Sequence, residues 1–358
     1  EQLWGRLDRA LDPASVYASA VVAAMDAARC GVTTVLDHHA SPSCIAGSLD
    51  LVRRAFCDDV GLRASVAYEV SDRDGQAKAL DGIEENLRAL AAPADGLARA
   101  HMGLHAAFTL SDETLARVAA RIPDGAGIHI HVAEGPEDEE QSLERHGMRV
   151  IERLDQFGLL RPPSILAHVL HLDEKEKDRV AERGVAVVHN PRSNMNNAVG
   201  TFDLDGYLRR SVVTGLGTDG LGANLLTELF TAGLLQKHAR HDSLAAGFGD
   251  LAKLLFVNNP KIVERAFGVR CGRIAPGCAA DIAILDYAAP TPLDGSTILG
   301  HLLFGVAAHA LRVSDLLVAG RDVIRNGAFV GVDEKAELAK AREQAAELWK
   351  RVSKGGGR

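Results

Sequence analysis

The sequence is poor in cysteine and in aromatic residues, and it has no long uninterrupted apolar run. Its 5 cysteines are an odd number without paired spacing, so we expect buried or free thiols in a reducing compartment, with the cytoplasm as the default. No apolar stretch approaches the roughly 20 residues that span a bilayer, and the first residues lack a signal-peptide pattern. We therefore expect a cytoplasmic protein without a membrane partner.

The sequence also has no excess of positive charge. The 40 lysines and arginines are outnumbered by 48 aspartates and glutamates, and no basic run stands out. Because nucleic-acid binding depends on contacts from basic residues to phosphates, this balance argues against nucleic acid as a partner. An initiator methionine is missing too, since the chain opens with Glu1 and Gln2. This opening indicates a fragment of a longer chain.

Short runs rich in valine, isoleucine, leucine and threonine alternate with helical stretches along much of the chain. Such alternation predicts right-handed β-α-β units and a parallel sheet. The expected strands are 31–39, 61–70, 100–108, 127–134, 164–171, 184–191 and 212–220. The expected helices are 13–29, 45–58, 76–91, 112–121, 140–157 and 173–183.

Nearly every expected strand is apolar at its start and polar or titratable at its end. This asymmetry is typical of a (β/α)8 barrel, whose active site gathers side chains from the C-terminal ends of many strands. A doubly wound sheet concentrates its ligands at one or two switch points and fits less well. Seven strands cannot close an eight-stranded barrel, so we expect an α/β, TIM-type barrel whose first strand lies upstream of residue 1.

The chain divides into three parts on this interpretation. Residues 1–268 form the truncated barrel, which ends in a helical stretch. Residues 269–330 form a small β-domain with a packing helix, in which 281–286 is an apolar strand and 314–327 is a hairpin. Residues 331–358 form a charged amphipathic helix and a flexible end.

The strongest local signal for chemistry lies in one expected strand, where His129 and His131 are two residues apart and Glu134 follows. Residues two apart in a strand share a face, so both imidazoles can point into the barrel, and a loop can turn Glu134 over its mouth. His168 ends the next strand and Asp219 ends the last one. Imidazoles and carboxylates at one mouth are the ligands of a catalytic Zn²⁺ or Fe²⁺ site with an open position for water. The alternative is that the paired strand histidines are satisfied inside a polar barrel core.

Five motifs occur in the order found in the amidohydrolase superfamily, which the chain resembles over nearly its whole length. They are Gly-Val-Thr-Thr-Val-Leu-Asp-His at 31–38, His-x-x-Glu at 131–134, Ala-His-Val-Leu-His-Leu at 167–172, His-Asn-Pro-Arg-Ser-Asn at 189–194 and Gly-Thr-Asp-Gly at 217–220. The most similar branch is that of the chlorohydrolases, cytosine deaminases and S-adenosylhomocysteine deaminases. Within this branch, segments 37–42 and 68–75 resemble the SsnA-type aminohydrolases. Segments 272–281 and 318–323 resemble the second half of the family's accessory β-sandwich.

The resemblance implies a role for each titratable residue at the mouth. His131 and Asp219 match metal ligands on the fifth and eighth strands, and the implied cofactor is one divalent ion, Zn²⁺ or Fe²⁺. His168 matches the histidine that holds the attacking hydroxide or the developing oxyanion, and Glu134 matches the proton shuttle. Deamination needs a nucleophile at the amine-bearing carbon and protons for the ring nitrogen and the departing ammonia. Catalytic roles for Glu134, His168 and Asp219 agree with this need.

Three further residues are candidates for binding the substrate. His105 matches a histidine that contacts substrate in relatives, and the alternative is a buried polar residue of the core. Glu69 and Arg73 follow an expected strand on the catalytic side. There they either contact the substrate or belong to a solvated charged loop.

One part of the family pattern is missing. The family's first two metal ligands form a His-x-His motif on the first strand, and no histidine precedes His38 here. His38 and His39 cannot replace that motif, because adjacent strand residues point to opposite faces. With only His131 and Asp219 as direct ligands, we expect the chain as given to bind metal weakly or not at all and to be inactive, whereas the full-length parent is active.

The sequence therefore predicts a metal-dependent hydrolase that deaminates or opens a purine-like or related N-heterocycle at a carbon–nitrogen bond. Its partner is a small-molecule substrate, and the resemblance together with the frequency of dimers favours a homodimer. Two alternatives stay open: a related enzyme that cleaves a cyclic amide or displaces chloride, and a catalytically dead scaffold that kept the barrel. The substrate and the choice between zinc and iron do not follow from the sequence.

Overall fold

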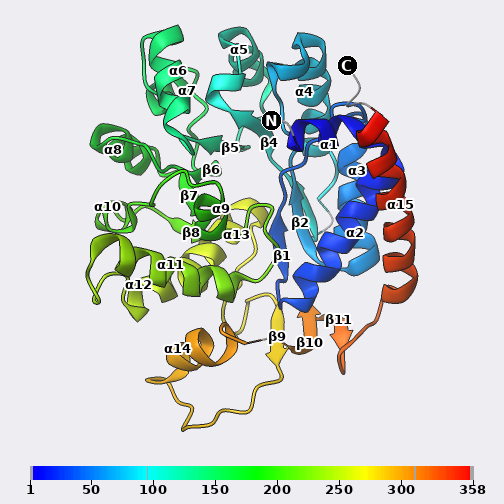
Figure 1. Cartoon of the computed structure of the whole chain (residues 1–358), viewed down its shortest axis with the longest axis vertical. Helices are drawn as coiled ribbons and strands as arrows, with labels where there is room; N and C mark the ends of the chain where they lie inside the picture. The colour runs from blue at the N-terminus through cyan, green and yellow to red at the C-terminus, as the bar shows by residue number, and fades with distance from the viewer. Residues whose placement is uncertain (1–2, 95, 310–311, 355–358) are drawn as a thin grey trace.

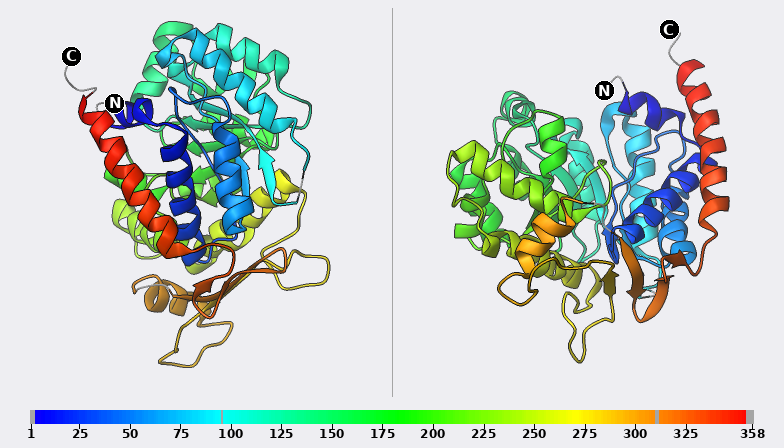
Figure 2. Two further views of the ribbon diagram at one scale, coloured as in Figure 1. Left: turned by 90° about the vertical axis from the view of Figure 1, so that its right-hand side faces the viewer. Right: turned by 60° about the horizontal axis from the view of Figure 1, so that its bottom comes forward.

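A computed structural model describes residues 3–94, 96–309 and 312–354 (Figure 1). Parallel strands lie at the centre of its largest part, and helices cover them on the outside (Figures 1 and 2). These strands are β1 (Thr34–Leu36), β2 (Arg63–Val66), β3 (Ala98–Ala100), β4 (Met102–Ala106), β5 (Ile128–Val132), β6 (Ile165–His168), β7 (Ala186–His189) and β8 (Thr214–Leu216).

The parallel strands follow one another in sequence order. β1 to β3 form one sheet and β4 to β8 form another. Only His101 separates β3 from β4, and the two act as halves of one strand, because β3 pairs with β2 and β4 pairs with β5. A bridge between Val70 and Leu104 joins the two sheets. The expected α/β fold is confirmed, and within the described residues the series of strands stays open between β8 and β1.

Helices cover the strands, and several of them begin with a side chain that accepts a hydrogen bond from the first turn. They are α1 (Trp4–Ala10), α2 (Pro13–Arg29), α3 (Ser48–Arg53), α4 (Gln76–Leu90), α5 (Asp112–Arg121), α6 (Pro136–His146), α7 (Val150–Gln156), α8 (Glu174–Arg183), α9 (Pro191–Asn196), α10 (Leu204–Arg209), α11 (Leu225–Arg240), α12 (Phe248–Ala252) and α13 (Asn259–Phe267). The Asp12 carboxylate accepts from the backbone N–H of Ser15, and Pro13 stands at the first position of α2. Ser111 caps α5 in the same way through the N–H of Thr114.

Two helical predictions need correction. The sequence predicts one helix over 140–157, but the structure has α6 and α7. Gly147 ends α6 with a φ of 69°, a left-handed conformation that glycine adopts easily because it has no Cβ. The helical stretch that the sequence predicts to end the barrel is also broken, since His241 leaves α11 with a φ of 51°.

A small antiparallel sheet follows the barrel part of the chain. Its strands are β9 (Ile282–Leu285), β10 (Val313–Val318), β11 (Arg321–Arg325) and β12 (Ala328–Phe329), and the short helix α14 (Ile298–Gly300) lies between β9 and β10. The predicted hairpin is β10 and β11. This sheet shares a hydrophobic core with α2 and β2, and a buried ion pair between Arg63 and Asp281 ties it to the barrel. The division of the chain at 268 and 330 stays a prediction.

The last helix, α15 (Glu334–Lys354), runs alongside α2 (Figure 2). Arg29 pairs with Glu334, and Arg351 donates to the carbonyl of Ala10 at 2.8 Å. The flexible end predicted at 355–357 lies outside the described residues. Across the part of the chain that the structure describes, no helix is both long and apolar enough to cross a membrane.

Candidate active site

Titratable side chains from six strands converge at the C-terminal ends of the parallel strands. They are His38 after β1, Glu69 after β2, His105 in β4, His131 in β5 with Glu134 after it, His168 in β6 and Asp219 after β8. Four residues at this end of the strands, Ala133, His168, Val169 and Asp219, have φ values of 44°, 71°, 48° and 49°. A positive φ costs energy in a residue that has a Cβ. It persists only where the surrounding structure holds the backbone in place, and such strained residues are typical of functional sites.

His131 presents a free lone pair at the centre of this mouth. Its Nδ1 donates to the carbonyl oxygen of His105 at 2.8 Å, so the lone pair of the neutral ring is on Nε2, where a ligand can reach it. The His131 ring stacks against His168 with 5.5 Å between centroids. It also lies 4.7 Å from the ring of His38. Nε2 is therefore the ring nitrogen of His131 that the carbonyl of His105 leaves open.

His168 and Glu134 face each other at the mouth. Nδ1 of His168 donates to Oδ1 of Asn194 at 2.8 Å, and its Nε2 lies 3.8 Å from Oε2 of Glu134. Burial lowers the pKa of His168, so its ring is neutral at neutral pH. Oε1 of Glu134 accepts from Nδ2 of Asn197 at 3.1 Å. Each side chain is thus oriented by an asparagine. Asn194 is the last residue of the motif at 189–194, whereas Asn197 lies outside the five motifs.

Asp219 completes this group from the end of β8. Its Oδ2 accepts from the hydroxyl of Ser193. Burial alone would raise the pKa of Asp219, but Ser193 and the nearby His168 and His131 outweigh that effect and lower the pKa. Asp219 is therefore an anion at neutral pH. One ligand atom each from Glu134, His168 and Asp219 lies within 4.8 Å of the other two.

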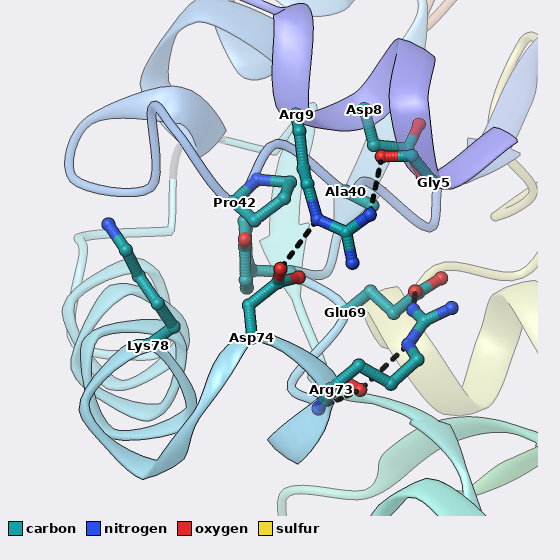
Figure 3. A pocket seen from close by; sticks show the side chains of 11 residues that line it. Gly5, Asp8, Arg9, Ala40, Pro42, Glu69, Arg73, Asp74 and Lys78 are labelled. Atoms are coloured by element: carbon teal, nitrogen blue, oxygen red, sulfur yellow. Dashed lines mark hydrogen bonds and ion pairs between the residues drawn. The ribbon is translucent and has the colours of Figure 1, made fainter. Parts of the chain in front are cut away.

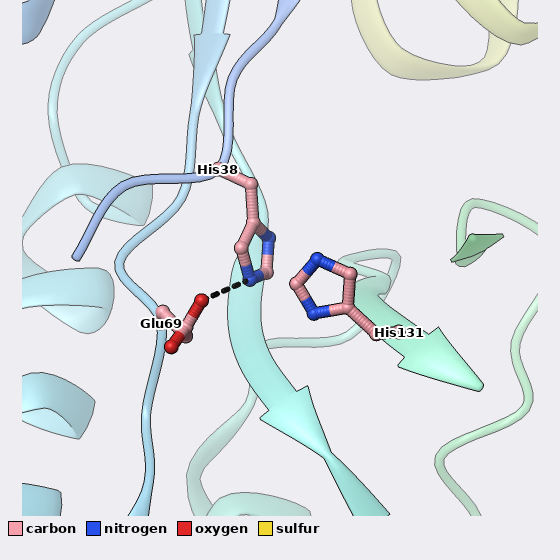
Figure 4. A group of neighbouring side chains, drawn as sticks. All are labelled: His38, Glu69 and His131. Atoms are coloured by element: carbon pink, nitrogen blue, oxygen red, sulfur yellow. Dashed lines mark ion pairs between the residues drawn. The ribbon is translucent and has the colours of Figure 1, made fainter. Parts of the chain in front are cut away.

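A second group of ligand atoms consists of His38, Glu69 and His131 (Figure 4). These atoms also lie within 4.8 Å of one another, with 3.6 Å between Nε2 of His38 and Oε2 of Glu69. Both nitrogens of His38 are buried and have no hydrogen-bond partner within the described residues. Burial and the surrounding histidines hold the pKa of His38 well below its usual value. The sequence analysis does not predict this group, although the first expected strand ends in two histidines, which are a signal for it.

His39 and His129, which are close in sequence to His38 and His131, do not join the groups at the mouth. Nε2 of His39 lies 2.9 Å from the hydroxyl of Ser41, so the prediction that His38 and His39 point to opposite faces is confirmed. His129 belongs to the barrel interior, where its ring lies 4.7 Å from that of His38 and 6.3 Å from that of His101. Burial lowers the pKa of His129 to about 3. Of the two histidines in β5, only the second therefore reaches the mouth.

The three predicted substrate residues form a network. Arg73 pairs with Oε1 of Glu69, and Nε2 of His105 lies 3.9 Å from the same oxygen. Burial raises the pKa of Glu69 and lowers the pKa of His105 to about 2. Only 12% of the Glu69 side chain is exposed, so Glu69 does not belong to a solvated loop. The Arg73 side chain is 36% exposed and reaches Glu69 from the loop.

A pocket beside Glu69 is covered by the first helix (Figure 3). α1 contributes Asp8 and Arg9 to its lining, and Arg9 pairs with Asp74 at 2.6 Å. Burial and the charge of Glu69 raise the pKa of Asp8 to about 6. Neither α1 nor these lining residues follow from the motifs, because they come close to Glu69 only when α1 folds over the mouth.

The donor atoms at the mouth fit a divalent metal ion. Neutral imidazole nitrogens and carboxylate oxygens are ligands that Zn²⁺ and Fe²⁺ accept in proteins. Nε2 of His131 and one of the two unpaired, buried nitrogens of His38 are polar atoms that a cation would satisfy. The two ligands expected from the sequence, His131 and Asp219, fall in different groups of three.

Known proteins resemble this chain over nearly its whole length. It matches a model described as the amidohydrolase family over residues 2–340. A 5'-deoxyadenosine deaminase of Methanopyrus kandleri is 32% identical over 356 residues, which cover 97% of this chain and 79% of that protein. A 5-methylthioadenosine/S-adenosylhomocysteine deaminase of Pelotomaculum thermopropionicum is 29% identical over 357 residues, which cover 97% of this chain and 78% of that protein.

Solved structures are similar in fold. An adenosine deaminase from Xanthomonas campestris with bound zinc has a TM-score of 0.81 and 24% identity, covering 97% of this chain and 78% of that one. An atrazine chlorohydrolase from Arthrobacter aurescens complexed with zinc has a TM-score of 0.76 and 22% identity, covering 96% of this chain and 79% of that one. At these identities the likeness shows a shared fold.

Proposed function

Because the chain belongs to the amidohydrolase family, whose members are metal-dependent, we propose that it removes the amino group from adenosine-type nucleosides. The resemblance seen in the sequence is confirmed at the level of this family, and the chain is a hydrolase of carbon–nitrogen bonds other than peptide bonds. Its substrates are small molecules. The finer likeness to SsnA-type aminohydrolases and the expected homodimer stay predictions.

One observation carries the proposal: two carboxylates and a neutral imidazole lie within 4.8 Å of one another beside His131. His131 and Asp219 are the proposed metal ligands, with Zn²⁺ or Fe²⁺ as the ion. The free Nε2 of His131 and the anionic Asp219 suit these roles. A divalent ion held there supplies a nucleophile at neutral pH, because it lowers the pKa of a water molecule.

The remaining steps are proton transfers by this chain's own side chains. Water adds to the amine-bearing ring carbon, the adjacent ring nitrogen takes one proton, and ammonia leaves after it receives another. Protonated Glu134 donates its proton to the ring nitrogen, and Asp219 accepts one proton from the attacking water and passes it to the amino group. The hydroxyl left on the ring carbon returns its proton to Glu134 as the carbonyl forms and ammonia leaves. His168 accepts a hydrogen bond from that water through Nε2, since Nδ1 is occupied by Asn194.

The substrate is proposed to lie between this group and the network of His105, Glu69 and Arg73. The Glu69 carboxylate can accept hydrogen bonds from substrate hydroxyls, and the partly exposed Arg73 guanidinium can donate to substrate oxygens. Glu69 also borders the pocket under α1. Groups attached to the substrate near Glu69 can therefore extend into that pocket, toward Asp8 and Arg9.

Ammonia release tests the proposal. The protein expressed from its full coding sequence and loaded with Zn²⁺ or Fe²⁺ is expected to release ammonia from 5'-deoxyadenosine, 5'-methylthioadenosine or S-adenosylhomocysteine. Glu134→Gln keeps the side-chain shape but cannot transfer a proton, so it is expected to lower kcat about 10²- to 10⁴-fold. The matched control is Glu137→Gln, at an exposed position of α6 close to Glu134, which is expected to leave kcat unchanged.

Two results would overturn this function. One is the absence of ammonia release from every adenine nucleoside by folded, metal-loaded protein. The other is an undiminished rate in Asp219→Ala, because that residue is placed at both the ion and the attacking water. Chloride release from a chlorinated N-heterocycle without ammonia release would favour the chloro-type alternative.

A further inference from the structure

A buried carboxylate that the proposed reaction does not use lies next to the segment of the proton-transfer residue Glu134. It belongs to Asp138, which is in the first turn of α6 and is 3% exposed. Its Oδ2 accepts from the backbone N–H of Ala133 at 2.8 Å, and its Oδ1 accepts from the N–H of Phe108 at 3.1 Å. We infer that Asp138 is a positioning residue that holds Glu134 in place for proton transfer and ties its segment to the turn after His105. The inference rests on the proposed function, because that reaction is what gives Glu134 a proton to move.

The bond to Ala133 fixes the backbone directly before Glu134. Ala133 is fully buried and has a φ of 44°. Its carbonyl accepts from the N–H groups of two residues that follow β6, at 3.1 and 3.2 Å. Asp138 supplies the matching hold on the N–H side. Since strained backbone persists only where its surroundings hold it, loss of this carboxylate would let Ala133 relax and carry Glu134 away from Nε2 of His168.

The bond to Phe108 ties in a second segment of the mouth. Phe108 lies in the turn 107–109, which directly follows β4. In the same turn the hydroxyl of Thr109 lies 2.9 Å from Nδ1 of His105, one of the proposed substrate residues. The carboxylate thus joins the segment after β5 to the segment after β4, so that the proton-transfer residue and the substrate histidine keep one relative placement.

Capping of α6 does not account for where this carboxylate points. Gly135 is the N-cap of α6, and Asp138 is the third residue of the helix. An acidic residue at this position usually accepts from the N–H of the N-cap residue in a capping box. The Asp138 side chain instead reaches past Gly135 to Ala133 and to a turn on another strand. Burial raises the pKa of Asp138 to about 6 although both N–H groups lower it, so the side chain is an anion at about pH 8.

Ammonia release by variants of the full, metal-loaded protein at about pH 8 tests this role. Asp138→Asn keeps the side-chain shape, but its NH₂ group faces one of the two N–H donors, so one hydrogen bond is lost. We expect kcat to fall about 10- to 100-fold with KM unchanged, because Glu69 and Arg73 still contact the substrate. In the Glu134→Gln background the same change is expected to cost less than about 3-fold, since the positioned side chain can no longer transfer a proton.

A matched control separates positioning from stability. Asp281→Asn also removes a buried carboxylate that accepts a backbone N–H, but Asp281 pairs with Arg63 at the N-terminal end of β2, away from the mouth. This control is expected to lower stability and leave kcat unchanged. The role of Asp138 is refuted by an unchanged kcat in Asp138→Asn, or by a fall in the Glu134→Gln background as large as in the wild-type protein.

A second measurement does not depend on the reaction. Amide hydrogen exchange is expected to be at least about 10-fold faster at Ala133 or Phe108 in Asp138→Asn than in the wild-type protein, because one N–H loses its acceptor. Faster exchange without ammonia release by the wild-type protein would overturn the proposed function and keep the hold of Asp138 on this segment. Ammonia release with unchanged exchange at both residues would refute the inference and leave the proposed function intact.

Discussion

Asp281→Ala is expected to lower the free energy of unfolding by about 3–5 kcal/mol, because it leaves the guanidinium of Arg63 buried without its anion. The two side chains are only 2% and 4% exposed, and their ion pair joins β2 to the residue before β9. Oδ1 of Asp281 also accepts from the N–H of Ala319 at 2.7 Å, in the turn between β10 and β11. One carboxylate therefore fastens the small sheet to the barrel at two points.

The remaining partners of Arg63 decide where in this range the loss falls. Its Nη1 reaches the hydroxyl of Thr34 only at 3.4 Å, and the ring of Phe267 lies 5.8 Å from the guanidinium carbon. Its Nε already lacks a hydrogen-bond partner within the described residues. Ala319 is exposed, so water reaches its freed N–H and the loss comes from the buried guanidinium. We therefore expect a loss near the upper end, about 4–5 kcal/mol.

Urea unfolding followed by circular dichroism measures this loss. The double variant Arg63→Met/Asp281→Leu replaces the pair by apolar side chains, so it is expected to be more stable than Asp281→Ala. Asp58→Ala breaks an ion pair with Arg53 whose side chains are 45% and 35% exposed, and it is expected to cost less than about 1 kcal/mol. A loss below about 1 kcal/mol in Asp281→Ala, or a double variant less stable than Asp281→Ala, would refute the reasoning.

Three further predictions concern pH, a positioning residue and the metal. Burial and the neighbouring Glu176 raise the pKa of Glu139 from 4.5 to about 8, so the folded state binds the extra proton and stability falls as pH rises through this window. Glu139→Gln is expected to flatten the pH dependence of Tm in calorimetry, unlike the exposed control Glu140→Gln, and an unchanged profile would contradict this. Asn194→Ala is expected to lower kcat about 10- to 100-fold, because His168 loses the acceptor that orients its ring, whereas a change in KM alone would indicate substrate contact. A chelator is expected to stop ammonia release and Zn²⁺ to restore it, and full activity in protein shown to be metal-free would exclude a metal-dependent reaction.

The order of the strands and the place where chemistry gathers could be predicted from the sequence. Apolar runs that alternate with helical periods specify β-α units, and right-handed crossovers bring the C-terminal ends of parallel strands to one side. For this reason the sequence alone placed Glu134, His168 and Asp219 at a common mouth beside His131, where the structure has them. The start of α2 could be predicted in the same way, because Asp12 as the N-cap and Pro13 at the first helical position are neighbouring residues.

Contacts between distant segments could not be predicted in this way. His38 and Glu69 reach His131 from two other strands, and no spacing in the sequence relates them. The ion pair of Arg63 and Asp281 likewise joins the barrel to the small sheet, so it appears only when both are folded. A local sequence pattern predicts a single helix or strand. These contacts instead depend on how separate helices and strands pack against one another.

The sequence by itself determined the family, the α/β architecture and the residue types at the mouth, because periodicity, caps and ordered motifs are written in neighbouring residues. Only the tertiary structure decided which atoms of those residues are free. Nδ1 of His131 is occupied by the carbonyl of His105 and Nδ1 of His168 by Asn194, each from a different segment. A histidine becomes a ligand or a base through the nitrogen that its neighbours leave open, and those neighbours are assembled by folding.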